Sequence, residues 1–220
     1  MSLKSLFDKL IMKFVLLLFF SAIISSKLIA QNYVTKVYDE RLGLYQKHIS
    51  EILKDNDGFL WLGTESGLVR FDGSNFNEFF PKESKYKYLG ISKIKKLNNF
   101  IYINYEKNGL LVFDLNKYQY KKIFDEPIID VQPISDSAFV VITKSGFLKK
   151  IVNGKTVQQI KIAASGGSLM ALFRGALYVS LPEIGINTYN TSNLKLLKSN
   201  YPDYRMYNHL IAKKKIEVGK

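Results

Sequence analysis

The sequence predicts an all-β protein, a β-propeller built from four-stranded blades. The main observation is a Gly-apolar pair that recurs inside short apolar segments, at Gly67, Gly109, Gly146 and Gly185, with spacings of 42, 37 and 39 residues. A repeat of about forty residues that keeps strand, turn and strand in constant phase is typical of propeller blades. The composition agrees, because 47% hydrophobic residues and no cysteine suit a globular domain without disulfides. A β-sandwich with regularly spaced hairpins is the alternative.

The first thirty residues resemble an export signal. Basic residues precede an apolar run from Phe14 to Ile24, and small or polar residues then lead to Ala30. Signal peptidase requires this order, so residues 1–30 are predicted to be a signal peptide and the mature chain to be periplasmic. An uncleaved membrane anchor is the alternative. Residues 31–47 form a lead-in segment that can supply an outer strand.

The clearest blade, at residues 48–80, is built around the stretch from Leu53 to Gly73. Three polar turn signals, each with a Gly, separate four apolar segments. Gly supplies the positive φ that tight reversals need. Strands are therefore predicted at 48–54, 59–63, 68–71 and 76–80.

Weaker copies of this blade follow along the chain. They lie at 91–124, 128–162 and 168–198, and residues 206–220 resemble the beginning of a fifth blade. A blade that stops after its second strand leaves an unpaired edge and an uncovered face. The sequence therefore predicts an incomplete ring from a truncated reading frame, with a tendency to self-association. A closed ring of four blades, with an outer strand from Tyr33–Leu44, is the alternative.

The first blade carries the pattern D-x-x-G-x-L-W-x-G-T-x-x-G-L-x-R-x-D-G, which resembles the two-component regulator propeller repeat. The pattern is filled by Asp55, Gly58, Leu60, Trp61, Gly63, Thr64, Gly67, Leu68, Arg70, Asp72 and Gly73. The resemblance covers Val34 to Phe80. The later copies lack the Trp and the Gly-Thr pair, so they rest on phase and turn placement.

This resemblance implies the periplasmic sensor region of a Bacteroidetes hybrid histidine kinase or related regulator. In that family, propellers precede an immunoglobulin-like domain, a membrane helix and a cytoplasmic kinase or DNA-binding output, and no such part is recognised in these 220 residues. The implied function is ligand sensing in signal transduction. Glycan fragments or other periplasmic small molecules are the implied ligands, and the output kinase of a full-length relative is the implied partner. A secreted propeller enzyme that cleaves glycans, as a lyase or hydrolase, and a nonfunctional gene fragment are the alternatives.

No motif predicts catalysis, a cofactor or a metal site, so a binding protein is predicted rather than an enzyme. His48 and His209 occupy equivalent places in their repeats, which explains them without a shared metal. The Asp55–Gly58 turn resembles the start of a calcium loop, but Ser66 stands where the final Glu ligand belongs. Ser165–Ser168 lacks the Lys of a phosphate-binding loop and is predicted to link two blades.

The charged residues leave one enzymatic alternative open. Carboxylates that converge at a propeller mouth could act as an acid–base pair on glycans. The candidates are Asp125, Glu126, Asp130 and Glu183. The net charge of +13 is spread along the chain without interleaved aromatic residues, so a basic outer surface is predicted and a nucleic-acid groove is not.

Trp61 can be interpreted as a platform for a sugar or as a packing residue. Its position inside an apolar strand favours packing between blades. Thr64 and Asp72 are likewise predicted to form hydrogen bonds within turns. Ligand contacts are expected on the less regular segments Pro81–Gly90 and Ala163–Ser168, and the sequence does not identify the ligand.

Overall fold

The structure is a computed structural model that describes residues 3–25, 35–46, 48–82, 86, 89–105, 107–182 and 184–200. The chain divides into two compact units, Met1–Val37 and Tyr38–Lys220. The first unit contains helix α1 (Leu3–Ser25), which is rich in Leu, a good helix former. Among the described residues, no helix has both the length and the apolar character needed to cross a membrane. Export directed by residues 1–30 stays a prediction.

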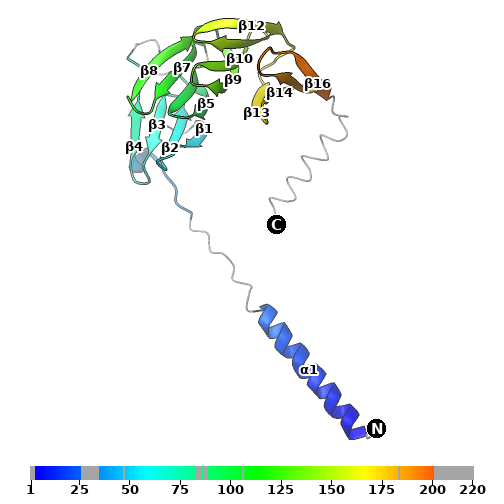
Figure 1. The fold of residues 1–220 in the computed structure, drawn as a ribbon. Helices are drawn as coiled ribbons and strands as arrows, with labels where there is room; N and C mark the ends of the chain where they lie inside the picture. Colours follow the sequence, from blue (N-terminus) through cyan, green and yellow to red (C-terminus); the bar gives the residue numbers. More distant parts are fainter. Residues whose placement is uncertain are drawn as a thin grey trace. The chain divides into compact units, whose positions relative to one another are not determined.

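The second unit contains four antiparallel sheets of four strands each, and within each sheet the strands pair in sequence order (Figure 1). Blade 1 consists of β1 (Ile49–Lys54), β2 (Leu60–Thr64), β3 (Leu68–Phe71) and β4 (Phe76–Phe79). Blade 2 consists of β5 (Ile91–Leu97), β6 (Phe100–Tyr105), β7 (Gly109–Asp114) and β8 (Gln119–Phe124). Blade 3 consists of β9 (Ile128–Ser135), β10 (Ala138–Thr143), β11 (Phe147–Val152) and β12 (Lys155–Lys161). Blade 4 consists of β13 (Leu169–Phe173), β14 (Ala176–Leu181), β15 (Gly185–Asn190) and β16 (Leu196–Asn200).

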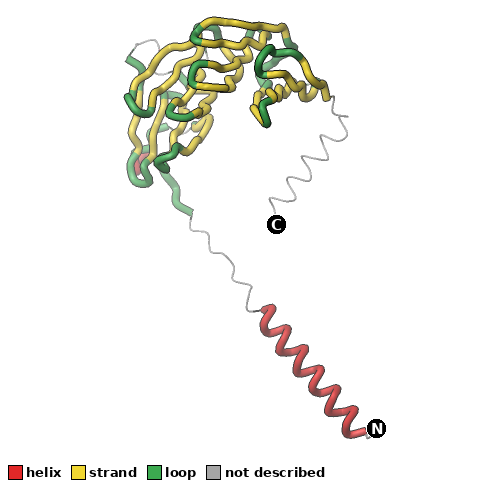
Figure 2. Tube along the Cα trace, in the orientation of Figure 1, coloured by secondary structure: helices red, strands yellow, loops and turns green. Residues whose placement is uncertain are grey.

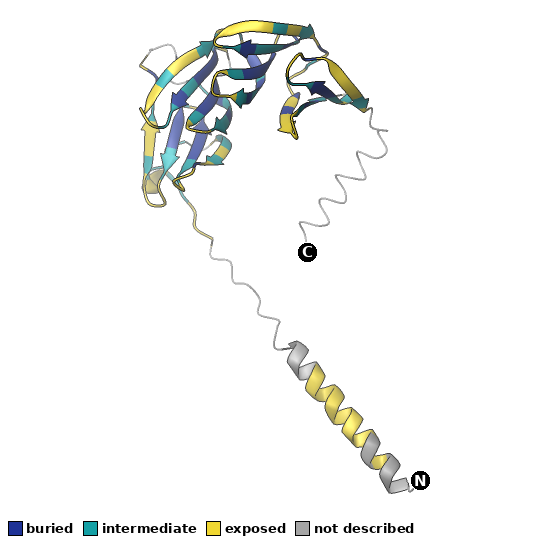
Figure 3. Ribbon diagram, in the orientation of Figure 1, coloured by how far each residue is buried: buried dark blue, intermediate teal, exposed yellow. Residues whose placement is uncertain are grey.

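Successive blades follow one another around an arc, with their first strands innermost (Figure 1). Strand β1 contacts β5, β5 contacts β9, and β9 contacts β13. Figure 3 shows buried positions concentrated inside the blades and exposed positions along outer strands such as β12. This radial succession of four-stranded sheets is β-propeller architecture, and the predicted fold class is confirmed. The expected partial blade at 206–220 lies outside the described residues.

The four repeated glycines lie in the turn between the second and third strands of each blade, or directly after it. Their φ angles are 142° at Gly67, 78° at Gly109, 81° at Gly146 and 111° at Gly185. A residue with a side chain is strained in this region of φ, whereas Gly is not. The recurring phase in the sequence therefore reflects a recurring backbone requirement. Figure 2 shows such turns as short loops between paired strands.

Three apolar clusters fill the junctions between consecutive blades. Trp61 and Leu68 of blade 1 meet Ile103 and Phe113 of blade 2. Tyr102 and Leu110 of blade 2 meet Val131 and Phe139 of blade 3. Val140 and Ile142 of blade 3 meet Leu177 and Val179 of blade 4. Burial on both faces explains why the second strands of blades 1 to 3 are apolar almost throughout.

The lead-in segment differs from the prediction. Residues 35–46 contain no strand, and their regular structure is a 3₁₀ turn at Glu40–Leu42. Tyr38 packs edge-on against Phe71 and Phe76 of blade 1, with ring centroids 4.9 and 5.6 Å away. The described residues 35–46 thus form no outer strand, and the Tyr38 ring packs against blade 1.

Candidate functional site

The Asp55 carboxylate organises the first turn of blade 1. Its Oδ1 atom accepts hydrogen bonds from the backbone N–H groups of Asp57 and Phe59, at 3.0 and 2.9 Å. Its Oδ2 atom accepts the indole N–H of Trp61 at 2.6 Å. Gly58, with φ at 93°, lies in the same turn. Protein donors thus contact both carboxylate oxygens, and the carboxylate holds the turn together.

Trp61 is fully buried at the junction of blades 1 and 2. Its ring centroid lies 5.3 Å from that of Phe79 and 5.4 Å from that of Phe113. The guanidinium carbon of Arg70 lies 5.9 Å from the Trp61 ring centroid, and Arg70 donates a hydrogen bond to the Tyr118 hydroxyl at 2.9 Å. An indole ring enclosed in this way presents no face to a sugar, so Trp61 packs between blades and is not a sugar platform.

Thr64 and Asp72 form hydrogen bonds within their turns. The Thr64 hydroxyl donates to the carbonyl oxygen of Gly67 at 2.8 Å. The Asp72 carboxylate accepts the backbone N–H groups of Asn75 and Ser74, at 2.7 and 2.8 Å. These backbone donors hold the pKa of the Asp72 carboxyl below its usual range, because they stabilise the charged form.

The remaining motif residues allow packing or a change of direction. Leu68 is fully buried. A Cβ atom at Gly63 would lie 2.9 Å from Cγ2 of Ile91, so glycine permits the close approach of β2 to blade 2. Gly73 has φ at 100° and turns the chain toward β4. The motif thus specifies blade structure and does not form an open site.

The residues considered as metal or phosphate ligands are not gathered into one site. His48 is exposed, with Nδ1 3.8 Å from Oε1 of Glu65, and His209 lies outside the described residues. The segment Ser165–Ser168 closes on itself, because the Ser165 N–H donates to the Ser168 hydroxyl at 3.0 Å. In the described part of the chain, no three His, Cys, Asp or Glu residues are grouped closely enough to hold a metal ion.

Three of the four carboxylates considered for catalysis pair with three different lysines. The pairs are Asp125 with Lys122, Glu126 with Lys149, and Asp130 with Lys95. The fourth carboxylate, Glu183, lies outside the described residues. Each described carboxylate is therefore held by its own cation, and these three do not form the facing pair that glycoside hydrolysis uses.

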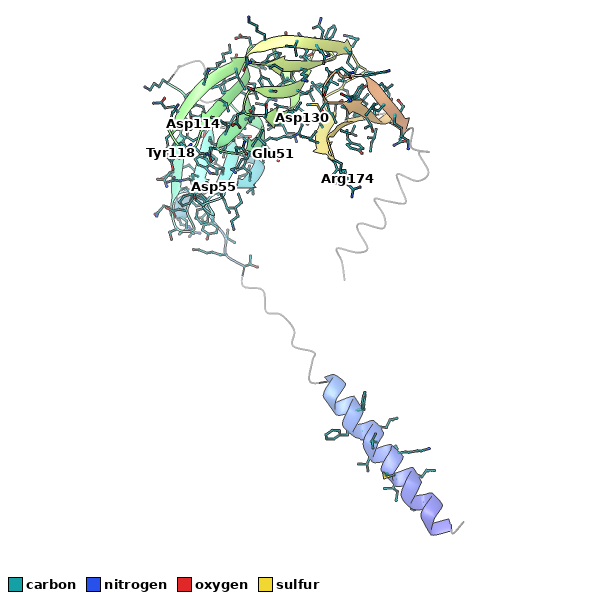
Figure 4. All side chains as sticks on the ribbon, viewed as in Figure 1. Glu51, Asp55, Asp114, Tyr118, Asp130 and Arg174 are labelled. Carbon is teal, nitrogen blue, oxygen red and sulfur yellow. The ribbon has the colours of Figure 1, made fainter. Side chains whose placement is uncertain are left out.

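Sequence reasoning named Asp130 only as a candidate acid and missed the polar cluster through which it joins three inner strands. The Lys95 ammonium on β5 lies 3.1 Å from Oδ2 of Asp130 on β9 and donates to the Met170 carbonyl oxygen on β13 at 2.9 Å. The same carboxylate accepts the N–H of Met170 at 2.6 Å and that of Val131 at 2.9 Å. Figure 4 shows Asp130 and Glu51 on the inner strands. Because protein donors satisfy both oxygens of Asp130, the cluster connects blades and offers no free carboxylate.

An open groove lies between blades 2 and 3 and has a cavity volume of about 470 Å³. It is lined by Phe100, Tyr102, Val112, Lys121, Lys122, Ile123, Phe124, Asp125, Asp136, Ser137, Phe139, Asn153 and Gly154. Small-molecule sites commonly measure roughly 300–1,000 Å³ and combine apolar walls with a few polar groups. The groove therefore has the size and composition of a small-molecule site.

The polar groups of the groove differ in how far the protein satisfies them. The Tyr102 hydroxyl donates to the Ser135 carbonyl oxygen at 3.3 Å, and burial, together with the nearby charge of Asp136, raises the pKa of the Tyr102 phenol. Asp136 accepts one hydrogen bond, from the Asn98 amide at 2.8 Å. Lys121 forms no ion pair with any described residue. Asp136 and Lys121 are thus the charged groups with capacity left for a ligand.

In the two segments expected to contact a ligand, none of the described residues is in the lining of this groove. In Pro81–Gly90, the described Tyr86 is buried, with its ring centroid 5.3 Å from that of Tyr105. In Ala163–Ser168, Ser168 is fully buried. The groove residues come instead from regular strands and hairpin turns of two blades and, for Asp125, from the connection between these blades. Only the pairing of those blades in space could have revealed them.

No protein-family model matches the sequence, and no curated protein matches it significantly. Among solved structures, the chain is similar to the extracellular domain of the proposed hybrid two-component system BT3049 from B. thetaiotaomicron. The TM-score is 0.61 at 17% identity, over 77% of this chain and 26% of that chain. It is also similar to the extracellular domain of the proposed hybrid two-component system BT4673 from the same organism. There the TM-score is 0.58 at 19% identity, over 74% of this chain and 23% of that chain.

A further similar structure is apo AztD from Citrobacter koseri, with a TM-score of 0.54 at 15% identity. That match covers 70% of this chain and 47% of AztD. The chain thus spans about a quarter of the two extracellular domains and about half of AztD. At these identities the likeness establishes the propeller fold alone, which is the fold that the four sheets display.

Proposed function

We propose that this chain is the ligand-binding propeller portion of an extracytoplasmic sensor in a two-component regulator. The observation that carries the proposal is the likeness of its blades to the extracellular domains of two proposed hybrid two-component systems. The first-blade motif, from Asp55 to Gly73, supports the same assignment by its resemblance to the propeller repeat of such regulators. The bound molecule is a small periplasmic compound, and the partner is an output kinase or regulator domain.

The groove between blades 2 and 3 is the proposed ligand site. Its volume of about 470 Å³ is sufficient for a small molecule. Its walls come from two blades, so a bound ligand would contact both and favour one arrangement of the junction over another. A ligand can shift a conformational equilibrium only by such a difference in affinity between two states. The groove is therefore suited to couple binding to a change in blade geometry.

The three described carboxylates that the sequence suggested as catalytic groups do not favour the alternative function, a glycan-cleaving enzyme. The carboxylates Asp125, Glu126 and Asp130 are each paired with a separate lysine. A general acid on glycans needs a carboxyl that can hold and release a proton beside the scissile bond. Asp125 and Asp136 both line the groove, but Asp125 pairs with Lys122, so the binding function is the one we propose.

Ligand binding by the groove can be tested with a variant that fills it. Ser137 lines the groove from the β9–β10 turn, and Asn99 holds the corresponding place in the β5–β6 turn of blade 2. We expect members of a set of periplasmic amino acids, oligosaccharides and nucleosides to raise the melting temperature of the purified full chain. The increase should disappear in Ser137→Trp and persist in the matched control Asn99→Trp. An increase that is equal in both variants, or turnover of an oligosaccharide by the chain, would contradict the proposal.

Export can be tested separately by cell fractionation. The full chain should be recovered from the periplasm of a Gram-negative host, shortened by about the length of residues 1–30. A chain that lacks those residues should remain in the cytoplasm. Recovery of the full chain from the cytoplasm, at its original length, would contradict an extracytoplasmic role.

A further inference from the structure

The floor of the groove offers apolar surface and almost no unused hydrogen-bonding groups. Phe100, Val112 and Ile123 line it and are half-buried, so part of each side chain remains accessible. The rings of Tyr102 and Phe139, with centroids 6.0 Å apart, close the junction between the blades. The Tyr102 hydroxyl already donates to a backbone carbonyl. An apolar ligand group can therefore be buried here without leaving a polar atom of the floor unsatisfied.

Two unpaired charges of opposite sign stand on the two sides of this floor. Lys121 belongs to β8 and pairs across the sheet with Val112, which places both side chains on the groove face of blade 2. Asp136 belongs to the β9–β10 turn of blade 3, and no described cation forms a salt bridge with its carboxylate. An ammonium from one blade and a carboxylate from the other thus remain available to a ligand.

The other two charged residues of the lining do not alter this pattern. Lys122 and Asp125 form a salt bridge with each other. The Asp125 carboxylate accepts a hydrogen bond from Lys122 and thereby raises the pKa of the Lys122 ammonium. Because this pair is neutral overall, the groove presents to a ligand one net positive group, one net negative group and an apolar floor between the blades.

From this arrangement we infer that the groove binds a zwitterionic small molecule with an apolar side chain, of the class of a hydrophobic amino acid or dipeptide. The ligand carboxylate pairs with Lys121, the ligand ammonium pairs with Asp136, and the side chain lies on the floor formed by Phe100, Val112 and Ile123. The inference rests on the proposed ligand-binding function and names the ligand class for the same groove.

A neutral oligosaccharide matches these groups less well. Sugar sites present an accessible aromatic face to the apolar side of the ring. In the groove, Tyr102 and Phe139 are only 2% and 4% exposed, so the accessible aromatic rings are those of the half-buried Phe100 and Phe124. A neutral ligand would leave the exposed Lys121 and Asp136 without a partner of opposite charge, and it would lack the charge-assisted hydrogen bonds that a zwitterion can make with them. The chemistry of the groove therefore favours a ligand that carries both charges.

The inference can be tested by isothermal titration calorimetry on the purified full chain, with the dipeptide leucyl-leucine as the probe. The N-acetylated dipeptide lacks the ammonium, and the C-terminal amide lacks the carboxylate. We expect leucyl-leucine to bind and each blocked form to bind at least tenfold more weakly. Failure of leucyl-leucine to bind, or equal affinity of the three compounds, would overturn the inference.

Two variants, each of which removes one charge, test which residue contacts the carboxylate of the ligand and which contacts its ammonium. Lys121→Gln should weaken leucyl-leucine at least tenfold and leave the affinity of the amide unchanged. Asp136→Asn should weaken leucyl-leucine to a similar extent and leave the affinity of the acetylated form unchanged. The matched control is Lys155→Gln, which removes an exposed lysine of blade 3 outside the groove and should have no effect. Circular dichroism of each variant checks that the blades are intact.

The outcomes separate this inference from the function on which it rests. If a neutral oligosaccharide binds and Ser137→Trp abolishes its binding, the ligand class is wrong and the groove remains a binding site. If Ser137→Trp affects the binding of no compound of any class, both the ligand class and the proposed site fail. If the two charge variants bind leucyl-leucine as the unmodified chain does, the assigned contacts are wrong.

Discussion

The Lys95 ammonium lies 3.1 Å from the Asp130 carboxylate, and it also donates to the Met170 carbonyl oxygen, so one side chain connects the inner strands of blades 2, 3 and 4. The Asp130 side chain is fully buried, and that of Lys95 is 25% exposed. A second inner pair, Lys93 with Glu51, has a similar separation of 2.7 Å but side chains that are 28% and 32% exposed. The two pairs therefore differ in solvent access, and the Lys95–Asp130 pair also makes hydrogen bonds to the backbone of Met170 and Val131.

Replacement of Asp130 should destabilise the protein strongly. In Asp130→Ala the buried N–H groups of Val131 and Met170 lose their acceptor, and Lys95 loses its counter-charge. We expect the free energy of unfolding to fall by about 3 kcal/mol, as is typical when one member of a buried pair is removed. Glu51→Ala, the matched change in the more exposed pair, should cost less than about 1 kcal/mol. Urea titrations of both variants measure the difference, and equal losses would refute a special role for Asp130.

The Asp55 turn should be similarly sensitive. Asp55→Ala leaves the indole N–H of Trp61 and two backbone N–H groups without their acceptor, so we expect a loss of about 2–3 kcal/mol. Asp72→Ala removes an equivalent turn carboxylate that is exposed, and its effect should be clearly smaller. Because Trp61 is the only tryptophan of the chain, its fluorescence emission reports unfolding directly. A red-shifted emission from native Asp55→Ala would also show that the ring has become accessible to water, whereas an unchanged stability would disprove the assigned role.

The blades could be predicted because their determinants are local in sequence. Gly67 and its equivalents are required by backbone φ angles within single hairpins. Trp61 lies in a strand whose apolar residues on both faces signal burial. The position of Tyr38 could not be predicted in the same way, because Tyr38 precedes the repeat and its ring partners Phe71 and Phe76 lie more than thirty residues further along the chain.

The groove could not be predicted because its groups belong to different blades. In the sequence, Lys121 looks like an ordinary charged residue of an outer strand, and Asp136 looks like an ordinary charged residue of a turn. Their relation depends on how blade 3 packs on blade 2, and neither residue encodes that packing. The Lys95 contact could not be predicted for the same reason, because Lys95 lies in blade 2 and its partners Asp130 and Met170 lie in blades 3 and 4. To predict contacts of this kind, one must know how the blades pack on one another, in addition to the repeat pattern in the sequence.

The repeated glycines allow steric crowding to be separated from backbone strain. Gly109 and Gly154 have nearly the same φ, 78° and 77°. A Cβ atom at Gly109 would lie 2.3 Å from the Phe124 carbonyl oxygen, whereas one at Gly154 would meet nothing within 4 Å. Gly154→Ala should therefore cost about 1–2 kcal/mol from strain alone, and Gly109→Ala should cost at least about 3 kcal/mol because the strands must also separate. Thermal unfolding of the two variants tests this order, and equal midpoints would show that crowding is relieved without cost.

The alkaline stability of the chain should depend on Tyr120, whose hydroxyl donates to the Phe79 carbonyl oxygen at 2.7 Å. Burial raises the pKa of this phenol, and the neighbouring Tyr105 adds to the increase. The native state therefore keeps a proton that the unfolded state releases above about pH 10. The resulting stabilisation is fully present below pH 10 and is lost as pH rises toward the native pKa.

Tyr120→Phe should accordingly lower the free energy of unfolding by about 1 kcal/mol at neutral pH, because one hydrogen bond is lost. It should also make the decline of stability between about pH 9 and 11.5 less steep, because one phenol fewer must be deprotonated on unfolding. Tyr45→Phe, a change at a side chain that is 67% exposed, should leave the steepness as in the unmodified chain. Urea titrations across this pH range measure the slopes. An unchanged slope in Tyr120→Phe would mean that the buried phenol does not limit alkaline stability.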